Sequence, residues 1–98
     1  MRARRKDGNQ GMVVAALRKV GCVVVVLDDA DFDLLVGFGG RWVCVEVKDG
    51  DLSPSRRELT TNERAFQELC RDRNLPWLLV EGVTDAVDLV NSRNTGRV

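Results

Sequence analysis

The stretch DFDLLVGFGGRWVCVEVK, residues 31–48, constrains the fold of this 98-residue chain more than any other. Two largely apolar runs flank Gly39 and Gly40, and a two-glycine link between strand-like runs predicts a β-hairpin. If these glycines form the turn, Asp33 faces Glu46 across the two strands. The apolar runs therefore carry charges in places where charge costs free energy unless something neutralises it.

The alternation of side chains along each strand sorts this hairpin into two faces. Asp33, Glu46 and Lys48 fall on one face, beside apolar neighbours. The opposite face is a candidate core, made of Leu34, Val36, Phe38, Val43, Val45 and Val47. Like charges that face each other destabilise a sheet, and a divalent cation bridging the two acids would compensate them. The alternative is a solvated polar face, which antiparallel sheets often have.

The rest of the chain supplies further helices and strands around this hairpin. Periodicity and turn residues predict helices over 8–20, from about Thr60 through Cys70, and over 83–90, with strands over 22–28 and 76–82. Thr60 and Glu63 have the spacing of a capping box. The order is α-β-β-β-α-β-α, which predicts an α/β fold with a mixed central sheet flanked by helices.

The length predicts a single domain over residues 1–98. Residues 1–7 form a basic arm, which either touches nucleic acid or is a solvated terminus. Residues 91–98 are expected to be a flexible tail. The 15 basic and 15 acidic residues balance, so net charge gives no overall attraction to a polyanion.

The composition excludes several kinds of chemistry. The chain has no histidine, which rules out Ser-His-Asp and Cys-His nucleophile systems and His-rich zinc sites. A bound metal would need oxygen ligands, which favours Mg²⁺, Mn²⁺ or Ca²⁺. The three cysteines lack CxxC spacing, and no apolar run is long enough to span a bilayer. We therefore expect reduced thiols, a cytoplasmic protein and no membrane partner.

Asp33, followed after a hairpin by Glu46-Val47-Lys48, resembles the D…(D/E)xK signature of the PD-(D/E)XK nucleases. The flanking stretches KDGNQ, VVAALRKVG, DFDLLVGF, VEVKDG and SRRELT resemble the small stand-alone VRR-NUC proteins, including phage-type members. The resemblance covers roughly residues 6–90 and implies a restriction-endonuclease-like core. It also implies that Asp33, Glu46 and the Val47 carbonyl bind the metal, and that Lys48 is the catalytic lysine.

The function implied by this resemblance is Mg²⁺-dependent (or Mn²⁺-dependent) hydrolysis of DNA phosphodiester bonds by an endonuclease. The resemblance to small VRR-NUC proteins suggests branched or Holliday-junction DNA as the substrate, and duplex DNA is the alternative. Cutting two strands with so small a core would call for a symmetric homodimer. The alternative is a non-catalytic DNA-binding or assembly module on a nuclease-like fold.

Three accessory candidates lie on the helices. At the start of the first helix, Asn9 is better placed by helical geometry and Gln10 matches a residue usual in the resembled family. The alternative for Asn9 is a helix-start residue that satisfies backbone N–H groups. Glu63 stands where relatives tend to have glutamine, and is either a further ligand or the capping partner of Thr60. The family's proline is replaced by Phe32.

The polar loop after the ExK strand is the candidate DNA contact. Ser53, Ser55, Arg56 and Arg57 could bind phosphates without reading sequence, and a solvated loop is the alternative. Trp42 and Trp77 are predicted to lie in the core instead of stacking on bases.

Overall fold

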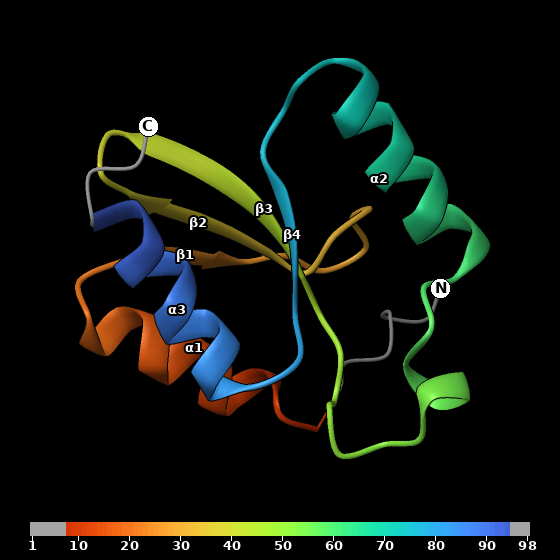
Figure 1. Ribbon diagram of the computed structural model, residues 1–98, viewed down its shortest axis with the longest axis horizontal. Helices are drawn as coiled ribbons and strands as arrows, with labels where there is room; N and C mark the ends of the chain where they lie inside the picture. The colour runs from red at the N-terminus through yellow and green to blue at the C-terminus, as the bar shows by residue number, and fades with distance from the viewer. Residues whose placement is uncertain (1–7, 95–98) are drawn as a thin grey trace.

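The computed structural model describes the backbone of residues 8–94 (Figure 1). Its elements in chain order are α1 (Gln10–Lys19), β1 (Val23–Val26), β2 (Leu34–Phe38), β3 (Arg41–Val47), the 3-10 helix η1 (Pro54–Arg57), α2 (Thr61–Asp72), β4 (Trp77–Val80) and α3 (Val83–Asn94). The predicted order of helices and strands is confirmed, and so is a small α/β fold with a mixed sheet. None of the helices within residues 8–94 is long and apolar enough to cross a membrane.

Each end of the chain either lies outside the described residues or differs from the prediction. The predicted basic arm, residues 1–7, lies outside the described residues, as do residues 95–98 of the predicted tail. Residues 91–94 of that tail are helical, because α3 continues to Asn94. The prediction that the last helix ends at residue 90 is therefore wrong. Residues 91–94 are all polar, so the apolar periodicity from which the helix was predicted does not reach them.

The sheet has four strands in the order β1-β2-β3-β4. The first three are antiparallel neighbours, and β4 lies parallel to β3. The predicted hairpin is confirmed, with Phe38 paired to Arg41 across the turn. Gly39 and Gly40 have φ of 58° and 81°, so both turn residues are left-handed, a conformation that glycine adopts without steric cost.

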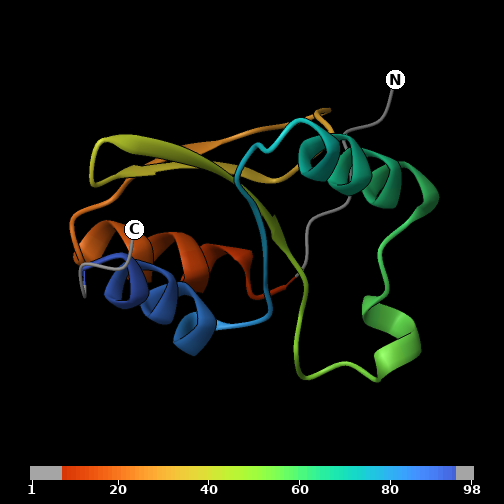
Figure 2. The same ribbon diagram turned by 45° about the horizontal axis from the view of Figure 1, so that its top comes forward.

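Helices cover the two faces of this sheet unequally (Figure 2). On one face α1 and α3 pack together against the predicted apolar side of the hairpin. Five of its six predicted residues are buried, and Phe38 packs against them half-buried. The opposite face carries α2 near one end of the strands. Trp42 lies on this second face and is 51% exposed, so the prediction of a core position for it is wrong, while Trp77 is half-buried.

The loop after β3 is tied to the end of β4. The N–H of Gly50 donates to the Glu81 carbonyl at 3.0 Å. Arg57 Nη1 pairs with Glu81 Oε2 at 2.8 Å, and its Nε donates to the Leu52 carbonyl at 2.9 Å. A Cβ at position 50 would stand 2.6 Å from the Glu81 carbonyl oxygen. The loop can approach β4 this closely only because residue 50 is glycine.

We expect Gly50→Ala to lower the free energy of unfolding by about 1–3 kcal/mol, because the added methyl group meets backbone that cannot move aside cheaply. Gly8→Ala is the matched control, since a Cβ there meets only Asp49 Oδ2 at 3.9 Å, an ordinary contact, and its change should stay within about 0.5 kcal/mol. Urea denaturation of the two variants measures the difference. Equal stabilities would contradict the close approach.

Candidate active site

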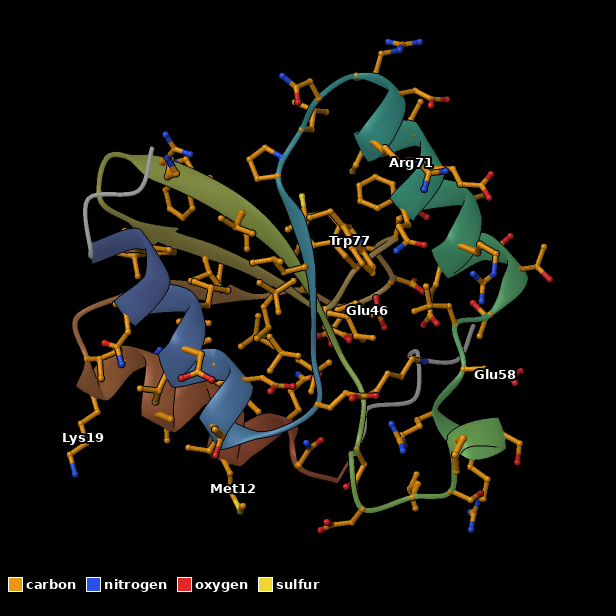
Figure 3. The ribbon with its side chains drawn as sticks, in the orientation of Figure 1. Met12, Lys19, Glu46, Glu58, Arg71 and Trp77 are labelled. Atoms are coloured by element: carbon orange, nitrogen blue, oxygen red, sulfur yellow. The ribbon has the colours of Figure 1, made fainter. Side chains whose placement is uncertain are left out.

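Four charged side chains from three parts of the chain meet at the end of the sheet that α2 covers. Asp33 precedes β2, Glu46 lies in β3, Lys48 follows β3, and Glu63 belongs to the first turn of α2. Asp33 is 4% exposed and Glu46 only 1%. Figure 3 shows Glu46 on β3, on the side of the sheet where α2 lies. The sequence analysis predicted that Asp33, Glu46 and Lys48 gather at one end of the hairpin, and the structure brings them together there with Glu63 as a fourth member.

The register at Asp33 differs from the expected one. The paired positions of β2 and β3 end at Leu34 and Val45, and the Asp33 N–H donates to the Val45 carbonyl at 3.1 Å. Asp33 is therefore not the ladder partner of Glu46, and that prediction is wrong. The Asp33 carboxylate instead accepts the Val47 N–H at 2.8 Å. The side chain thus takes a position that a strand carbonyl would hold, and this brings it beside the Glu46–Lys48 segment.

The carboxyl of Glu46 is in contact with two other acids. Burial, then hydrogen bonding to Asp33 and repulsion from it, then the same two effects from Glu63, raise the pKa of Glu46 from 4.5 to about 9. Without a cation Glu46 therefore holds a proton at neutral pH. Asp33 and Glu63 both act on Glu46, and Glu63 also pairs with Lys48, so three acids and one lysine lie close together in a place largely shielded from water.

Lys48 is held by the first turn of α2. Its Nζ lies 2.9 Å from Glu63 Oε1, and the same oxygen accepts the Thr60 N–H at 2.8 Å. The Glu63 N–H donates in return to Thr60 Oγ1 at 3.2 Å, which confirms the capping box. Glu63 is therefore the capping-box partner of Thr60 and also a neighbour of Lys48 and Glu46. Its role as a metal ligand stays a prediction.

The pKa of Glu63 moves in the opposite direction to that of Glu46. Burial alone would raise it. The hydrogen bond from the Thr60 backbone, those shared with Lys48 and Glu46, and the charge of Lys48 outweigh burial, so the pKa is lowered. Glu63 is thus the ionised acid that holds the lysine, and Glu46 is the acid that holds a proton.

Asn9 and Gln10 take different positions at the start of α1. Asn9 is the N-cap residue but makes no side-chain capping bond. Its Nδ2 donates to the Lys48 carbonyl at 3.2 Å and the Glu81 carbonyl at 3.4 Å, so it joins the ends of β3 and β4. Gln10 is buried, and its Oε1 has no hydrogen-bond partner among the described residues. Asn9 therefore anchors the segment that carries Lys48.

The predicted DNA-contact loop has an exposed part and a part that is held against the rest of the protein. Ser53, Ser55 and Arg56 are exposed, and the two serine hydroxyl oxygens lie 3.5 Å apart. Arg57 is half-buried and engaged with Glu81. The sequence analysis did not single out Glu81. Its position near the end of the strand predicted over 76–82 was the available signal, because the ends of parallel neighbours such as β3 and β4 lie together.

The metal chemistry can be judged from the donor atoms. Within residues 8–94, no group of three or more Asp, Glu or Cys side chains is arranged to hold a metal ion. The predicted ligands are two carboxylates, Asp33 and Glu46, together with the Val47 carbonyl. All are hard oxygen donors, and Mg²⁺ is often bound by one or two carboxylates while keeping several waters. The donor set fits Mg²⁺ or Mn²⁺ by its chemistry.

Comparisons of the chain with protein-family models, with curated proteins and with solved structures found no match. A functional proposal therefore depends on the site and on the sequence motif, because a fold of this class hosts many activities.

We expect Glu46→Gln to remove a pH-dependent loss of stability. The pKa of Glu46 is raised on folding, so its contribution to stability is fully present below pH 4.5 and is lost as the pH rises to about 9. Within that window the wild-type free energy of unfolding falls by about 1.4 kcal/mol per pH unit from this group. Glutamine resembles the protonated form of Glu46 and does not titrate, so the free energy of unfolding of Glu46→Gln lacks this dependence on pH.

Urea denaturation of both proteins at intervals across that window, in the presence of chelator, measures the difference. The stability of Glu46→Gln relative to wild type should rise steadily with pH. Parallel curves for the two proteins would mean that Glu46 is ionised throughout and that the acids do not crowd one another.

Proposed function

We propose that this chain is a metal-dependent endonuclease that hydrolyses DNA phosphodiester bonds, of the PD-(D/E)XK type and similar to the small VRR-NUC proteins. The observation that supports it most is the meeting of Asp33, Glu46 and Lys48 at one buried place. The element order is also the one expected of a restriction-endonuclease-like core, with the hairpin β2–β3, then α2, then β4 parallel to β3.

The proposed roles follow from the chemistry of each group. Asp33 and Glu46 would hold a divalent cation together with the Val47 carbonyl, and the positive charge of that cation would favour the carboxylate form of Glu46. The chemistry that Mg²⁺ would supply there is polarisation of a phosphoryl oxygen and a lower pKa for a coordinated water. The Asp33 carboxylate is already oriented by the Val47 N–H at 2.8 Å.

Lys48 is the group proposed to act on the substrate. Its ammonium stabilises the negative charge that develops on the phosphate or orients the attacking water. Glu63 positions it by an ion pair of 2.9 Å, and Asn9 holds the backbone carbonyl of the same residue. Both contacts restrict where the lysine can lie before substrate binds, which reduces the entropy lost in the reaction.

The exposed part of the loop after β3 is the proposed phosphate contact, with Arg56 as its charged residue. Such contacts fix a duplex or a branch in register without reading bases. Branched DNA is proposed as a substrate on the resemblance to small VRR-NUC proteins, with duplex as the comparison.

We expect Mg²⁺-dependent cleavage of plasmid or four-way-junction DNA, lost with chelator. Asp33→Asn and Lys48→Ala should each lower the cleavage rate by about 100-fold or more, because each removes a group that acts on the metal or the developing charge. Asp88→Asn and Lys19→Ala are matched controls that remove the same charges at exposed positions on α3 and α1. Gel assays under single-turnover conditions measure the rates.

Two outcomes would contradict the nuclease. If wild type binds DNA but cuts neither substrate with Mg²⁺ or Mn²⁺, the chain is a binding or assembly module. If cleavage survives in both Asp33→Asn and Lys48→Ala, the activity comes from a contaminant or from another site.

Arg56 and Arg57 should separate DNA binding from stability. We expect Arg56→Ala to weaken DNA binding and to lower the slope of log affinity against log salt by about 1, the value for one lost phosphate contact. Arg57→Ala should instead lower thermal stability, because it breaks the bonds to Leu52 and Glu81. Fluorescence anisotropy over a salt series and thermal melts measure the two effects. An unchanged salt slope in Arg56→Ala would remove the loop from the proposed interface.

A further inference from the structure

A hollow lies between the C-terminal half of α2 and the start of β4. Its volume is about 340 Å³, and its lining combines one aromatic ring, two further apolar side chains, one amide and one guanidinium, from Trp77, Pro76, Leu75, Gln67 and Arg71. Leu75 is 56% exposed and Arg71 is exposed as well, so solvent reaches the hollow. Trp77, for which the sequence analysis favoured a core position, is only half-buried. The hollow therefore presents an accessible aromatic ring with polar groups beside it.

The hollow lies on the same face of the sheet as the candidate active site. Trp77 pairs with Cys44 in the parallel ladder of β3 and β4. Cys44 and Glu46 are two residues apart on β3, so Trp77 and Glu46 point to the same face, because side chains alternate along a strand. At about 3.3 Å per residue and about 4.8 Å between strands, the Cα atoms of Trp77 and Glu46 are roughly 8 Å apart. In Figure 3, Glu46, Trp77 and Arg71 follow one another on the side of the strands where α2 lies.

The helix α2 connects the site with the hollow. Glu63, Gln67 and Arg71 follow one another at intervals of four residues, so they lie along one flank of the helix. Glu63 is the residue that holds Lys48, and each interval advances about 6 Å along the helix axis. Within residues 8–94, the side chains of Gln67 and Arg71 make no hydrogen bond or ion pair. Their polar groups are therefore available to a ligand one to two helical turns from the site.

An unpaired nucleobase has the chemistry that fits this hollow. The ring face of any base stacks on an aromatic side chain, and the edge of the base carries donors and acceptors that an amide can meet. A guanidinium beside the ring suits the phosphate that adjoins the base. Sites for small ligands have volumes of about 300–1,000 Å³, so a hollow at the lower end of that range suits a single base.

The distance between the hollow and the site also suits one DNA strand. Successive nucleotides of a strand are spaced by about 3.4 Å along a duplex, and by more where the bases are unstacked. A separation of roughly 8 Å between the Cα atoms of Trp77 and Glu46 therefore corresponds to a few nucleotides at most. A base in the hollow and a phosphate at the acids can belong to the same strand.

We propose that the hollow binds an unpaired nucleobase close to the scissile phosphate, with Trp77 as the stacking surface and Gln67 and Arg71 as its polar neighbours. This proposal rests on the proposed nuclease function, and it names the feature of the DNA that the chain selects. That feature is a base without a partner, as at a bulge or beside a branch point. A fully paired duplex keeps its bases within the stack, and extruding one costs free energy.

The test compares two DNA duplexes with one bulged nucleotide each, an adenine in the first and an abasic nucleotide in the second. The ratio of their two affinities reports the contribution of the base, and a partly unfolded variant does not change a ratio. We expect wild type to bind the adenine bulge about tenfold more tightly, the effect of one stacked base. Trp77→Leu should bind the two duplexes equally. Fluorescence anisotropy in the presence of chelator, which prevents metal-dependent cleavage, measures the affinities.

Trp42→Leu is the matched control. Trp42 lies on the same face of the sheet but does not line the hollow, so this variant should keep the tenfold ratio. It also leaves Trp77 as the only tryptophan of the chain. The adenine bulge should therefore quench the tryptophan fluorescence of Trp42→Leu, and the abasic bulge should quench it much less.

Equal affinities of wild type for the two bulges would overturn this proposal and leave the nuclease proposal standing. So would a ratio that persists in Trp77→Leu or disappears in Trp42→Leu. Binding of neither duplex would contradict both proposals. The tenfold ratio in a protein that cuts no DNA would support the base site and contradict only the nuclease.

Discussion

The bond between the Asp33 carboxylate and the Val47 N–H sets the geometry of the whole site. It replaces a strand–strand bond with a side chain-to-backbone bond, and so ends the regular pairing of β2 with β3. An acid that a regular ladder would place opposite Glu46 is drawn instead beside the Glu46–Lys48 segment. The chain thereby gains a fixed carboxylate at the place where the two strands separate.

The helix α2 closes this place by means of its own N-terminal cap. Glu63 satisfies the Thr60 N–H, as in many helices, and the same oxygen holds Lys48. One carboxylate thus begins the helix and positions the lysine, so that helix formation and site assembly depend on each other. The resulting contact of Glu63 with Glu46 raises the cost of ionising Glu46. Such a crowding of acids is a local conflict of the kind that proteins retain at functional sites.

At the site, charged side chains are buried. On the rest of the same face of the sheet the reverse holds, because the apolar side chains of Val23, Val25 and Trp42 are exposed to solvent. Trp42 packs over Gly37, whose missing Cβ leaves room for the indole, and remains half exposed. The helix α2 covers only the part of this face that lies near one end of the strands (Figure 2).

The order of helices and strands, the Gly39–Gly40 turn and the core face of the hairpin were determined by the sequence, because they follow from local periodicity and glycine. Sequence alone also selected Asp33, Glu46 and Lys48. Only the tertiary structure decided the shifted register at Asp33, the double use of Glu63, and the anchoring of the loop by Glu81. These depend on which backbone donor or acceptor is left without a partner when distant segments pack, and no pattern along the chain records that.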